Sequence, residues 1–242
     1  RVRIGGGALL SGTLGARYMV ATIGGTHSCK TAGESFFVEG PRDAEGYPTF
    51  TGASAIADEF GGPMGATLAD FDQDGAFDLA ITTDPSVMIW RGADVFPLRR
   101  VDDAYGTSLL RGRLTRAQLP WVFAYLDVDR DGALDAVVTH GNHALDPGET
   151  PIGPQWTSVH RGAVGTPCLR EVVGGYGLSR DGGWITLSVG DIDRDGDADF
   201  VVGGRGETSR IYRNDLPDST HGLSVRLHGT TSNPLGIGAR IE

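Results

Sequence analysis

The stretch Asp70-Phe-Asp72-Gln-Asp74-Gly75-Ala-Phe-Asp78 decides the fold, because two later stretches of the chain repeat its pattern. These are Asp127-Val-Asp129-Arg-Asp131-Gly132-Ala-Leu-Asp135 and Asp191-Ile-Asp193-Arg-Asp195-Gly196-Asp-Ala-Asp199. Each nine-residue stretch has carboxylates at positions 1, 3, 5 and 9, and a glycine at position 6 that permits a sharp turn. Carboxylates at this spacing can converge on a hard cation that prefers several oxygen ligands, so each stretch predicts a calcium-binding loop.

The residues after each loop argue against an EF-hand. An EF-hand places a bidentate Glu at position 12 on an exiting helix, whereas this chain has Ile81, Val138 or Val202 there. The runs that contain these residues are short, apolar and rich in β-branched side chains, which suits buried strands. We therefore expect each loop to lie in a β-hairpin.

The predicted metal ligands are the side chains at positions 1, 3, 5 and 9 and the backbone carbonyl at position 7. A solvated acidic turn is the simpler alternative, but three copies share four ligands and the turn glycine, so we expect three Ca²⁺ sites. We expect the ion to be structural, since a site filled by protein oxygens leaves little room for substrate chemistry. The predicted ligand residues are Asp70, Asp72, Asp74, Ala76, Asp78, Asp127, Asp129, Asp131, Ala133, Asp135, Asp191, Asp193, Asp195, Asp197 and Asp199.

Composition sets the class of protein. The chain has 242 residues, 39% of them hydrophobic, enough for a substantial core, and no apolar run approaches the length of a membrane span. The net charge is −10, and the acidic residues are concentrated in the three loops, which hold 13 of the 31. Bound divalent ions would offset much of it. The 21 basic residues are scattered, so no nucleic-acid partner is indicated.

The loops mark a repeated unit of roughly 60 residues, a period that indicates a supersecondary repeat. A second pattern (aliphatic, aromatic, Arg, small) follows each loop and predicts a further strand in each unit. We expect its arginines to bond carbonyls or carboxylates of a neighbouring unit. An earlier unit, with strands over residues 18–23 and 37–40, has no acidic loop because the first aspartate is Asp43. The second pattern occurs as Ile89-Trp-Arg91-Gly92, Val159-His-Arg161-Gly162 and Ile211-Tyr-Arg213-Asn214.

Four such units predict an all-β fold, a β-propeller of four-stranded antiparallel blades, because a lone sheet of this kind cannot bury both faces. The expected blades are residues 1–63 without a calcium loop and 64–118, 119–183 and 184–220 with one. An insertion at 141–156, rich in Pro and Gly, interrupts the third unit. A separate segment is expected at 221–242.

The repeats resemble the FG-GAP/VCBS family, whose members build calcium-bearing β-propellers such as the integrin α-subunit head. Phe60-Gly61 matches the FG element, whereas the Gly-Ala-Pro element is absent after every loop, which makes the chain closer to VCBS. The C-terminal segment, from Arg213-Asn214-Asp215 to the Gly236-Ile-Gly238-Ala-Arg240 motif, resembles the start of an ASPIC/UnbV domain, as in the cartilage acidic protein family. It departs from that family at Gly222, where a tryptophan is usual. This resemblance implies about seven blades and further C-terminal strands, so we expect a partial or truncated propeller.

Other reactive side chains give weaker signals. His140-Gly-Asn-His143 is a close histidine pair, but two ligands without a Cys or carboxylate cluster fit ordinary loop histidines better than a transition-metal site. Cys29 and Cys168 are either disulfide partners or separate thiols. Trp121 and Trp184, shortly before their loops, are expected to pack between blades.

The sequence predicts a non-catalytic, calcium-stabilised module that binds a protein or a glycan, with the 141–156 insertion as the main contact region. Its first residues lack the apolar core of a signal peptide, so the chain is mature, truncated or cytosolic. Calcium loops favour a secreted, periplasmic or cell-surface location. Two other functions stay open. One is a biosynthetic enzyme or accessory protein with a site in the propeller funnel. The other is a structural subunit of a larger complex, whose open strand edges a partner covers.

Overall fold

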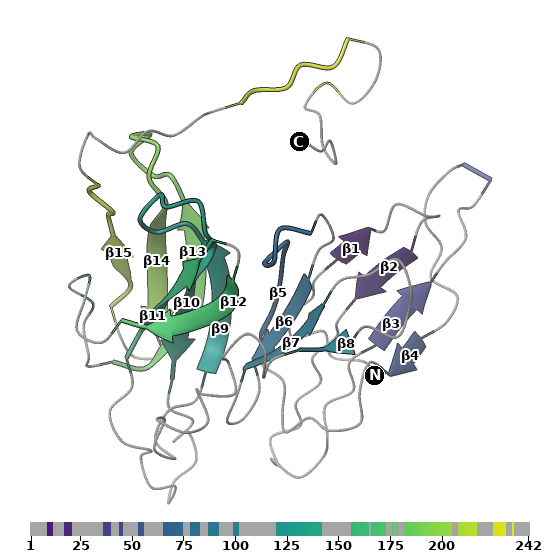
Figure 1. Ribbon diagram of the computed structural model, residues 1–242, viewed down its shortest axis with the longest axis horizontal. Coiled ribbons are helices and arrows are strands. Elements are labelled where there is room, and N and C mark those ends of the chain that lie inside the picture. Colours follow the sequence, from purple (N-terminus) through teal and green to yellow (C-terminus); the bar gives the residue numbers. More distant parts are fainter. Residues whose placement is uncertain are drawn as a thin grey trace, which may run out of the picture.

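The structure is a computed structural model of the whole chain. It describes residues 9–11, 17–20, 36–39, 44–45, 53–55, 65–74, 78–82, 87–91, 99–101, 120–141, 156–164, 166–172, 176, 178, 182–204, 208–216, 225–230 and 234. Within these ranges the chain forms antiparallel sheets and no helix (Figure 1). The predicted all-β class is therefore confirmed for the described residues.

In the described ranges, fifteen strands form four sheets in chain order. The first sheet contains β1 (Leu9–Ser11), β2 (Arg17–Val20), β3 (Phe36–Glu39) and β4 (Ala53–Ala55). The second contains β5 (Gly65–Ala69), β6 (Asp78–Thr82), β7 (Val87–Arg91) and β8 (Arg99–Arg100). The third contains β9 (Pro120–Leu126), β10 (Asp135–His140), β11 (Ser158–Ala163) and β12 (Thr166–Glu171). The fourth contains β13 (Trp184–Gly190), β14 (Asp199–Gly204) and β15 (Arg210–Tyr212).

Each sheet is a meander in which neighbouring strands are consecutive in the chain. The three acidic loops connect the first two strands of their sheets, as in the β5–β6 pair, where Ala69 lies opposite Asp78. The corresponding pairs are Leu126 with Asp135 and Gly190 with Asp199. The prediction that the loops lie in β-hairpins is therefore confirmed. The repeated Arg pattern forms β7, β11 and β15, the predicted additional strand of each unit.

Among the described residues, two hydrophobic cores lie between successive sheets. The first joins Phe71, Ala80 and Ile89 of the β5–β8 unit to Phe123 and Val138 of the β9–β12 sheet. The second joins residues of the β9–β12 unit, including Val128, Val137 and Val159, to residues of the next sheet, including Trp184, Phe200 and Val202. Because both faces of β10 take part in a core, all six of its residues are buried.

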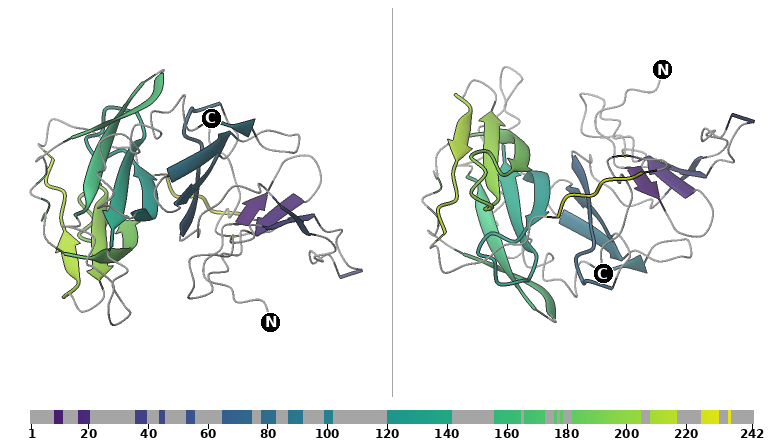
Figure 2. Two further views of the ribbon diagram at one scale, coloured as in Figure 1. Left: turned by 90° about the horizontal axis from the view of Figure 1, so that it is seen from below. Right: turned by 90° about the horizontal axis from the view of Figure 1, so that it is seen from above.

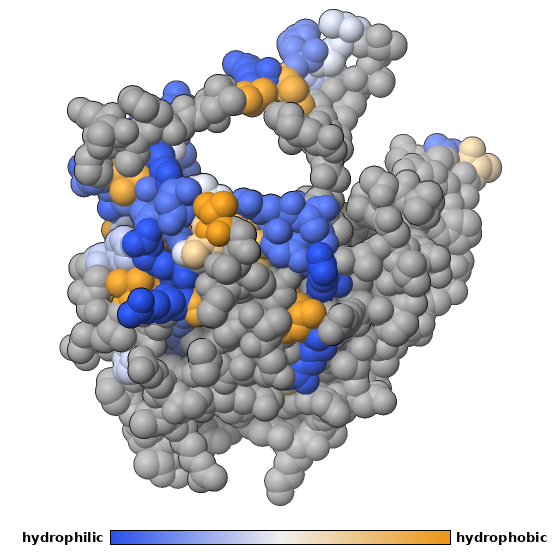
Figure 3. Space-filling model, in the orientation of Figure 1, coloured by the Kyte–Doolittle hydropathy of each residue, from blue (hydrophilic) through white to orange (hydrophobic). Residues whose placement is uncertain are grey.

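The first strands of three sheets lie side by side, since β9 contacts β5 on one side and β13 on the other. Figures 1 and 2 show the four sheets in a row, with β1–β4 at one end and β13–β15 at the other. On the face drawn in Figure 3, the described residues are mostly hydrophilic, with separate hydrophobic spots. No helix among the described residues is long and apolar enough to cross a membrane.

Several predicted features lie outside the described residues. They include Cys29, the side chain of Cys168, His143, Ala76, Phe60-Gly61 and residues 142–155 of the insertion. The two ends of the insertion are described, because Nδ1 of His140 donates a hydrogen bond to the carbonyl of Trp156 at 2.7 Å. The insertion therefore leaves the β9–β12 sheet at the end opposite its acidic loop.

Candidate metal centres

The three acidic loops have the same backbone conformation where they are described. Position 4 lies in the left-handed region in each, with φ of 57° at Gln73, 57° at Arg130 and 66° at Arg194. Position 6 also has a positive φ, 87° at Gly132 and 92° at Gly196. Side chains rarely adopt this region, so the predicted role of the turn glycine is confirmed in the second and third loops.

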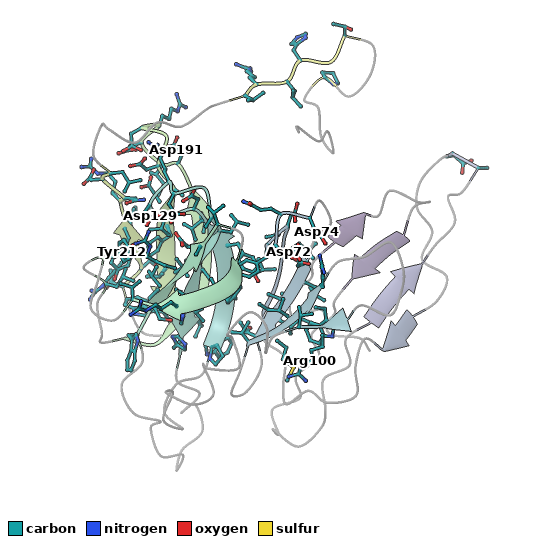
Figure 4. All side chains as sticks on the ribbon, viewed as in Figure 1. Asp72, Asp74, Arg100, Asp129, Asp191 and Tyr212 are labelled. Atoms are coloured by element: carbon teal, nitrogen blue, oxygen red, sulfur yellow. The ribbon has the colours of Figure 1, made fainter. Side chains whose placement is uncertain are left out.

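The carboxylates at positions 1, 3 and 9 converge in all three loops. In each group the three carboxylates offer oxygens that all lie within 4.8 Å of one another. Each group could hold a metal ion, since carboxylate oxygens are the ligands that hard cations prefer. Figure 4 shows labelled members of the three loops toward the same end of their sheets. The groups are Asp70, Asp72 and Asp78; Asp127, Asp129 and Asp135; and Asp191, Asp193 and Asp199.

The aspartate at position 9 is the buried member of each group, because it begins the second strand. One of its oxygens accepts a hydrogen bond from the backbone N–H at position 2, at 2.9, 2.9 and 2.7 Å in the three loops. In two loops the other oxygen accepts from the third strand or just beyond it. Gly162 N donates to Asp135 Oδ1 at 2.8 Å, and Asn214 N donates to Asp199 Oδ1 at 2.8 Å. Position 9 therefore joins the loop to the third strand, a role that the sequence pattern did not indicate.

The aspartates at position 5 do not join these groups. Asp74 forms an ion pair with Arg91 at 2.7 Å, and Asp131 forms one with Arg161 at 3.2 Å. Asp195 Oδ1 instead accepts a hydrogen bond from the backbone N–H of Asp197 at 2.9 Å. Direct ligation by the carboxylates at position 5 therefore stays a prediction.

The recurring arginines bind the loop of their own sheet. Arg91 also pairs with Asp72 at 2.9 Å, and Arg161 also pairs with Asp129. In the third unit, Arg213 lies 3.6 Å from Asp193 and pairs with Asp215 at 2.7 Å. In place of the expected bonds to a neighbouring unit, the described contacts of these arginines are with their own loop. Arg91 and Arg161 lie near the ends of β7 and β11, and Arg213 directly follows β15, so each guanidinium lies beside the carboxylates of its own loop.

Contacts between neighbouring loops come from position 4. Nε2 of Gln73 donates a hydrogen bond to the carbonyl of Gly132 at 2.9 Å. Arg130, at the equivalent position of the next loop, forms an ion pair with the buried carboxylate of Asp197 and lies 3.5 Å from the carbonyl of Asp195. In both loops the residue at position 4 that contacts the next loop has a left-handed backbone conformation. The loops therefore form a row in which each contacts the next.

Electrostatics in the second loop favour a cation. Burial raises the pKa of Asp135 to about 6, and the charges of Asp129 and Asp131 add to this, although backbone N–H groups of Gly162 and Val128 oppose it. Oδ1 of Asp129 is buried and accepts no hydrogen bond within the described part of the chain. The other oxygen of Asp129 pairs with Arg161, which leaves Oδ1 able to accept a cation, so the donor set fits a hard divalent ion.

Two of the residues at position 7, Ala133 and Asp197, are described, and both make polar contacts through groups other than the backbone carbonyl. The N–H of Ala133 donates to Asp131 Oδ1 at 2.9 Å. The side chain of Asp197 accepts from the N–H of Leu216 at 2.8 Å in addition to its pair with Arg130. The ligand role of these backbone carbonyls stays a prediction.

Two histidines of the β9–β12 sheet are buried. Burial lowers the pKa of His140 to about 4, although its hydrogen bond to the Trp156 carbonyl opposes this shift. Burial also lowers the pKa of His160 to about 3, and the charge of His140 adds to this shift. His160 shares a hydrogen bond of 2.9 Å with the hydroxyl of Ser158. No group of three metal-ligating side chains in the described ranges includes a histidine.

Trp184 is fully buried in the core between two sheets, which confirms its predicted place.

No protein-family model matches this chain, and no curated protein matches it. The site is therefore interpreted from its own geometry.

Proposed function

We propose that this chain is a calcium-stabilised β-propeller that serves as a binding or scaffolding module for a protein or a glycan, outside the cell or in a bacterial envelope. The observation that carries the proposal is the convergence of three carboxylates at the same positions of three loops. Calcium takes six to eight oxygen ligands, and carboxylates and backbone carbonyls supply them in such loops. Magnesium is a poorer fit because it demands near-ideal octahedral geometry and keeps several waters.

The order of the sheets supports the propeller. In a propeller each blade is an antiparallel meander whose first strand lies nearest the central axis. Here three successive meanders place their first strands side by side, and the faces of successive sheets pack on each other. All three loops then lie on one rim. A bound ion would hold each hairpin at that rim, which is a structural use of the metal.

Calcium removal tests the metal part of the proposal. We expect the midpoint of thermal unfolding to be higher in Ca²⁺ than in excess chelator. The increase caused by Ca²⁺ should exceed the increase caused by Mg²⁺. A ligand at 100 times its dissociation constant stabilises the folded state by about 2.7 kcal/mol per site. Asp129→Asn should reduce the gain, whereas Asp215→Asn, outside the loops, should retain it. Equal midpoints in Ca²⁺ and chelator for the unaltered chain would refute structural calcium.

The binding role is tested at the insertion. Its ends lie away from the acidic loops, so replacement of residues 142–155 by a short Gly-Ser linker should leave the unfolding midpoint unchanged. A panel of immobilised glycans and extracellular matrix proteins provides the probes. We expect the unaltered chain to bind a member of the panel and the shortened chain to lose that binding. Equal binding by both chains would show that the insertion is not part of the contact region.

A further inference from the structure

The two ends of the insertion meet at a buried histidine. His140 is the last residue of β10, and Ser158 is the first residue of β11. The side chain of His140 is fully buried, and its Nδ1 donates a hydrogen bond of 2.7 Å to the carbonyl of Trp156. Thr157, between Trp156 and Ser158, is only 3% exposed. This hydrogen bond therefore joins the strand end that leads into the insertion to the segment that leads out of it.

The hydrogen bond also fixes the tautomer of His140. A carbonyl oxygen can only accept, so Nδ1 carries the proton and Nε2 of the neutral ring is bare. Nε2 is buried and has no hydrogen-bond partner within the described part of the chain. A second proton on this ring would place an N–H group and a positive charge where no acceptor is described. The buried position therefore suits a neutral imidazole and disfavours an imidazolium.

A second buried histidine lies near the first. His160 is 3% exposed, and its Nε2 shares a hydrogen bond of 2.9 Å with the hydroxyl of Ser158. Ser158 lies opposite Val138, which belongs to the core shared with the β5–β8 sheet. The charge of His140 lowers the pKa of His160, so the two rings are close enough to repel each other when both are protonated. The strand ends beside the insertion thus contain two histidines that the fold keeps neutral.

The neighbouring strands do not stabilise a charge on His140. Burial lowers its pKa to about 4, and the described group that opposes this shift is the Trp156 carbonyl, not a carboxylate. β5 and β13 contain no titratable side chain. On the other strands of these sheets, the side chains of Arg99, Cys168 and Glu171 lie outside the described residues. The described titratable side chains on those strands are Asp78, Arg91, Arg100, Tyr125, Asp135, His160, Arg161 and Arg170.

We propose that His140 is a pH-sensitive contact that holds the ends of the insertion at neutral pH and releases them in mild acid. On release the ring moves into water, Nε2 takes up one proton from solvent, and the hydrogen bond to the Trp156 carbonyl is lost. The two strand ends then separate, while the cores on both faces of β10 hold the rest of the sheet. Control of partner binding by this release rests on the proposed function, whereas the release itself does not.

The direction of the effect follows from proton binding. The ordinary pKa of a histidine is 6.5, whereas that of buried His140 is about 4. Below pH 6.5 the open form therefore binds a proton that the closed form binds only near pH 4, so opening becomes more favourable as the pH falls between these values. One such proton raises the ratio of open to closed molecules by about a hundredfold across this range.

Hydrogen exchange of the full chain from about pH 7 to about pH 4 measures the opening, in excess chelator and with correction for the intrinsic rate of each amide. We expect the exchange of residues 139–141 and 157–159 to rise by about a hundredfold, while residues 79–81 in the next sheet stay better protected at every pH. His140→Gln should remove the rise, because its amide can still donate to the Trp156 carbonyl but does not titrate. The exposed His228→Gln should retain it. Exchange of all three segments in a single step, or a rise that persists in His140→Gln, would overturn the proposal.

Nitrogen chemical shifts of the imidazole rings test the same contact in the unaltered chain. At neutral pH His140 should show the tautomer protonated at Nδ1. Its protonation should coincide with the loss of amide protection at residues 139–141 and 157–159, whereas the exposed His228 should titrate independently of that loss. A tautomer protonated at Nε2, or protonation of His140 without loss of amide protection, would contradict the proposal. This measurement decides the matter even if His140→Gln does not fold.

Discussion

The guanidinium of Arg130, in the loop after β9, forms an ion pair with the carboxylate of Asp197, in the loop after β13. The pair is largely buried, with exposed fractions of 16% and 4% for the two side chains. It joins two successive sheets at the rim where the acidic loops lie. A buried pair is costly to break from one side, because the remaining charge loses its partner.

Arg130→Gln should therefore lower the free energy of unfolding by about 2 kcal/mol. Urea unfolding in excess chelator measures this effect without a contribution from metal. Arg170→Gln is the matched control, because Arg170 is exposed on β12. An equal loss in both variants would show that the Arg130 pair contributes nothing specific.

The aspartate at position 9 should stabilise the fold even without metal. Asp135→Ala removes the acceptor of two backbone N–H groups, those of Val128 and Gly162. Leaving two buried donors unsatisfied costs about 3 kcal/mol. Asp131→Ala, at an exposed position of the same loop, should cost under about 1 kcal/mol. Chelator-treated samples should show this difference in urea unfolding, and similar losses would contradict the assigned role.

Arg161 should affect calcium affinity and metal-free stability in opposite directions. Its guanidinium pairs with Asp129 and Asp131, so it stabilises the loop while no cation is bound. The same positive charge repels an incoming ion. Arg161→Gln should raise calcium affinity roughly two- to fivefold, the range of an exposed ion pair, and should slightly lower the unfolding midpoint in chelator. Titration calorimetry measures the affinity, and a weaker affinity in the variant would refute this competition.

Gly162 should not tolerate a side chain. A Cβ at this position would clash with the carbonyl oxygen of Leu134, so the backbone would have to move. Gly162→Ala should cost about 2–3 kcal/mol of folding free energy. Gly190→Ala provides the control, because no heavy atom lies within 4 Å of its Cβ position. Comparable denaturation curves for the two variants would show that the loop relaxes freely.

The buried histidines predict loss of stability in mild acid. The folded chain holds His140 and His160 neutral, with pKa values of about 4 and 3, whereas the ordinary value is 6.5. As the pH falls below 6.5 the unfolded chain binds protons first, so unfolding becomes more favourable until the folded pKa is reached. For His140 this amounts to about 3 kcal/mol between pH 6.5 and pH 4.

His140→Gln should flatten that pH dependence relative to the unaltered chain. The exposed His228→Gln is the control, and it should leave the pH dependence unchanged. Urea unfolding in chelator at several pH values provides the measurement. Parallel curves for the unaltered chain and His140→Gln would contradict a neutral buried histidine.

Much of the fold follows from local sequence. The spacing of the aspartates and the β-branched runs after them predicted the three hairpins, because turn chemistry and strand periodicity are local properties. The convergence of positions 1, 3 and 9 follows from the same turn. The partners of Gln73, Arg130 and Arg161 did not follow, because they depend on how strands and sheets are placed in space. The burial of His140 was missed for the same reason, since its position next to the insertion favoured an exposed loop residue.

The insertion between β10 and β11 starts and ends at the rim of its sheet that carries no acidic loop, where His140 bonds Trp156. We therefore expect that the length of the insertion can change without altering the acidic turn at the other rim. This separation makes the site suitable for grafting, since a foreign peptide with closely spaced ends could replace residues 142–155. The host would then display that peptide at the rim opposite the three acidic loops.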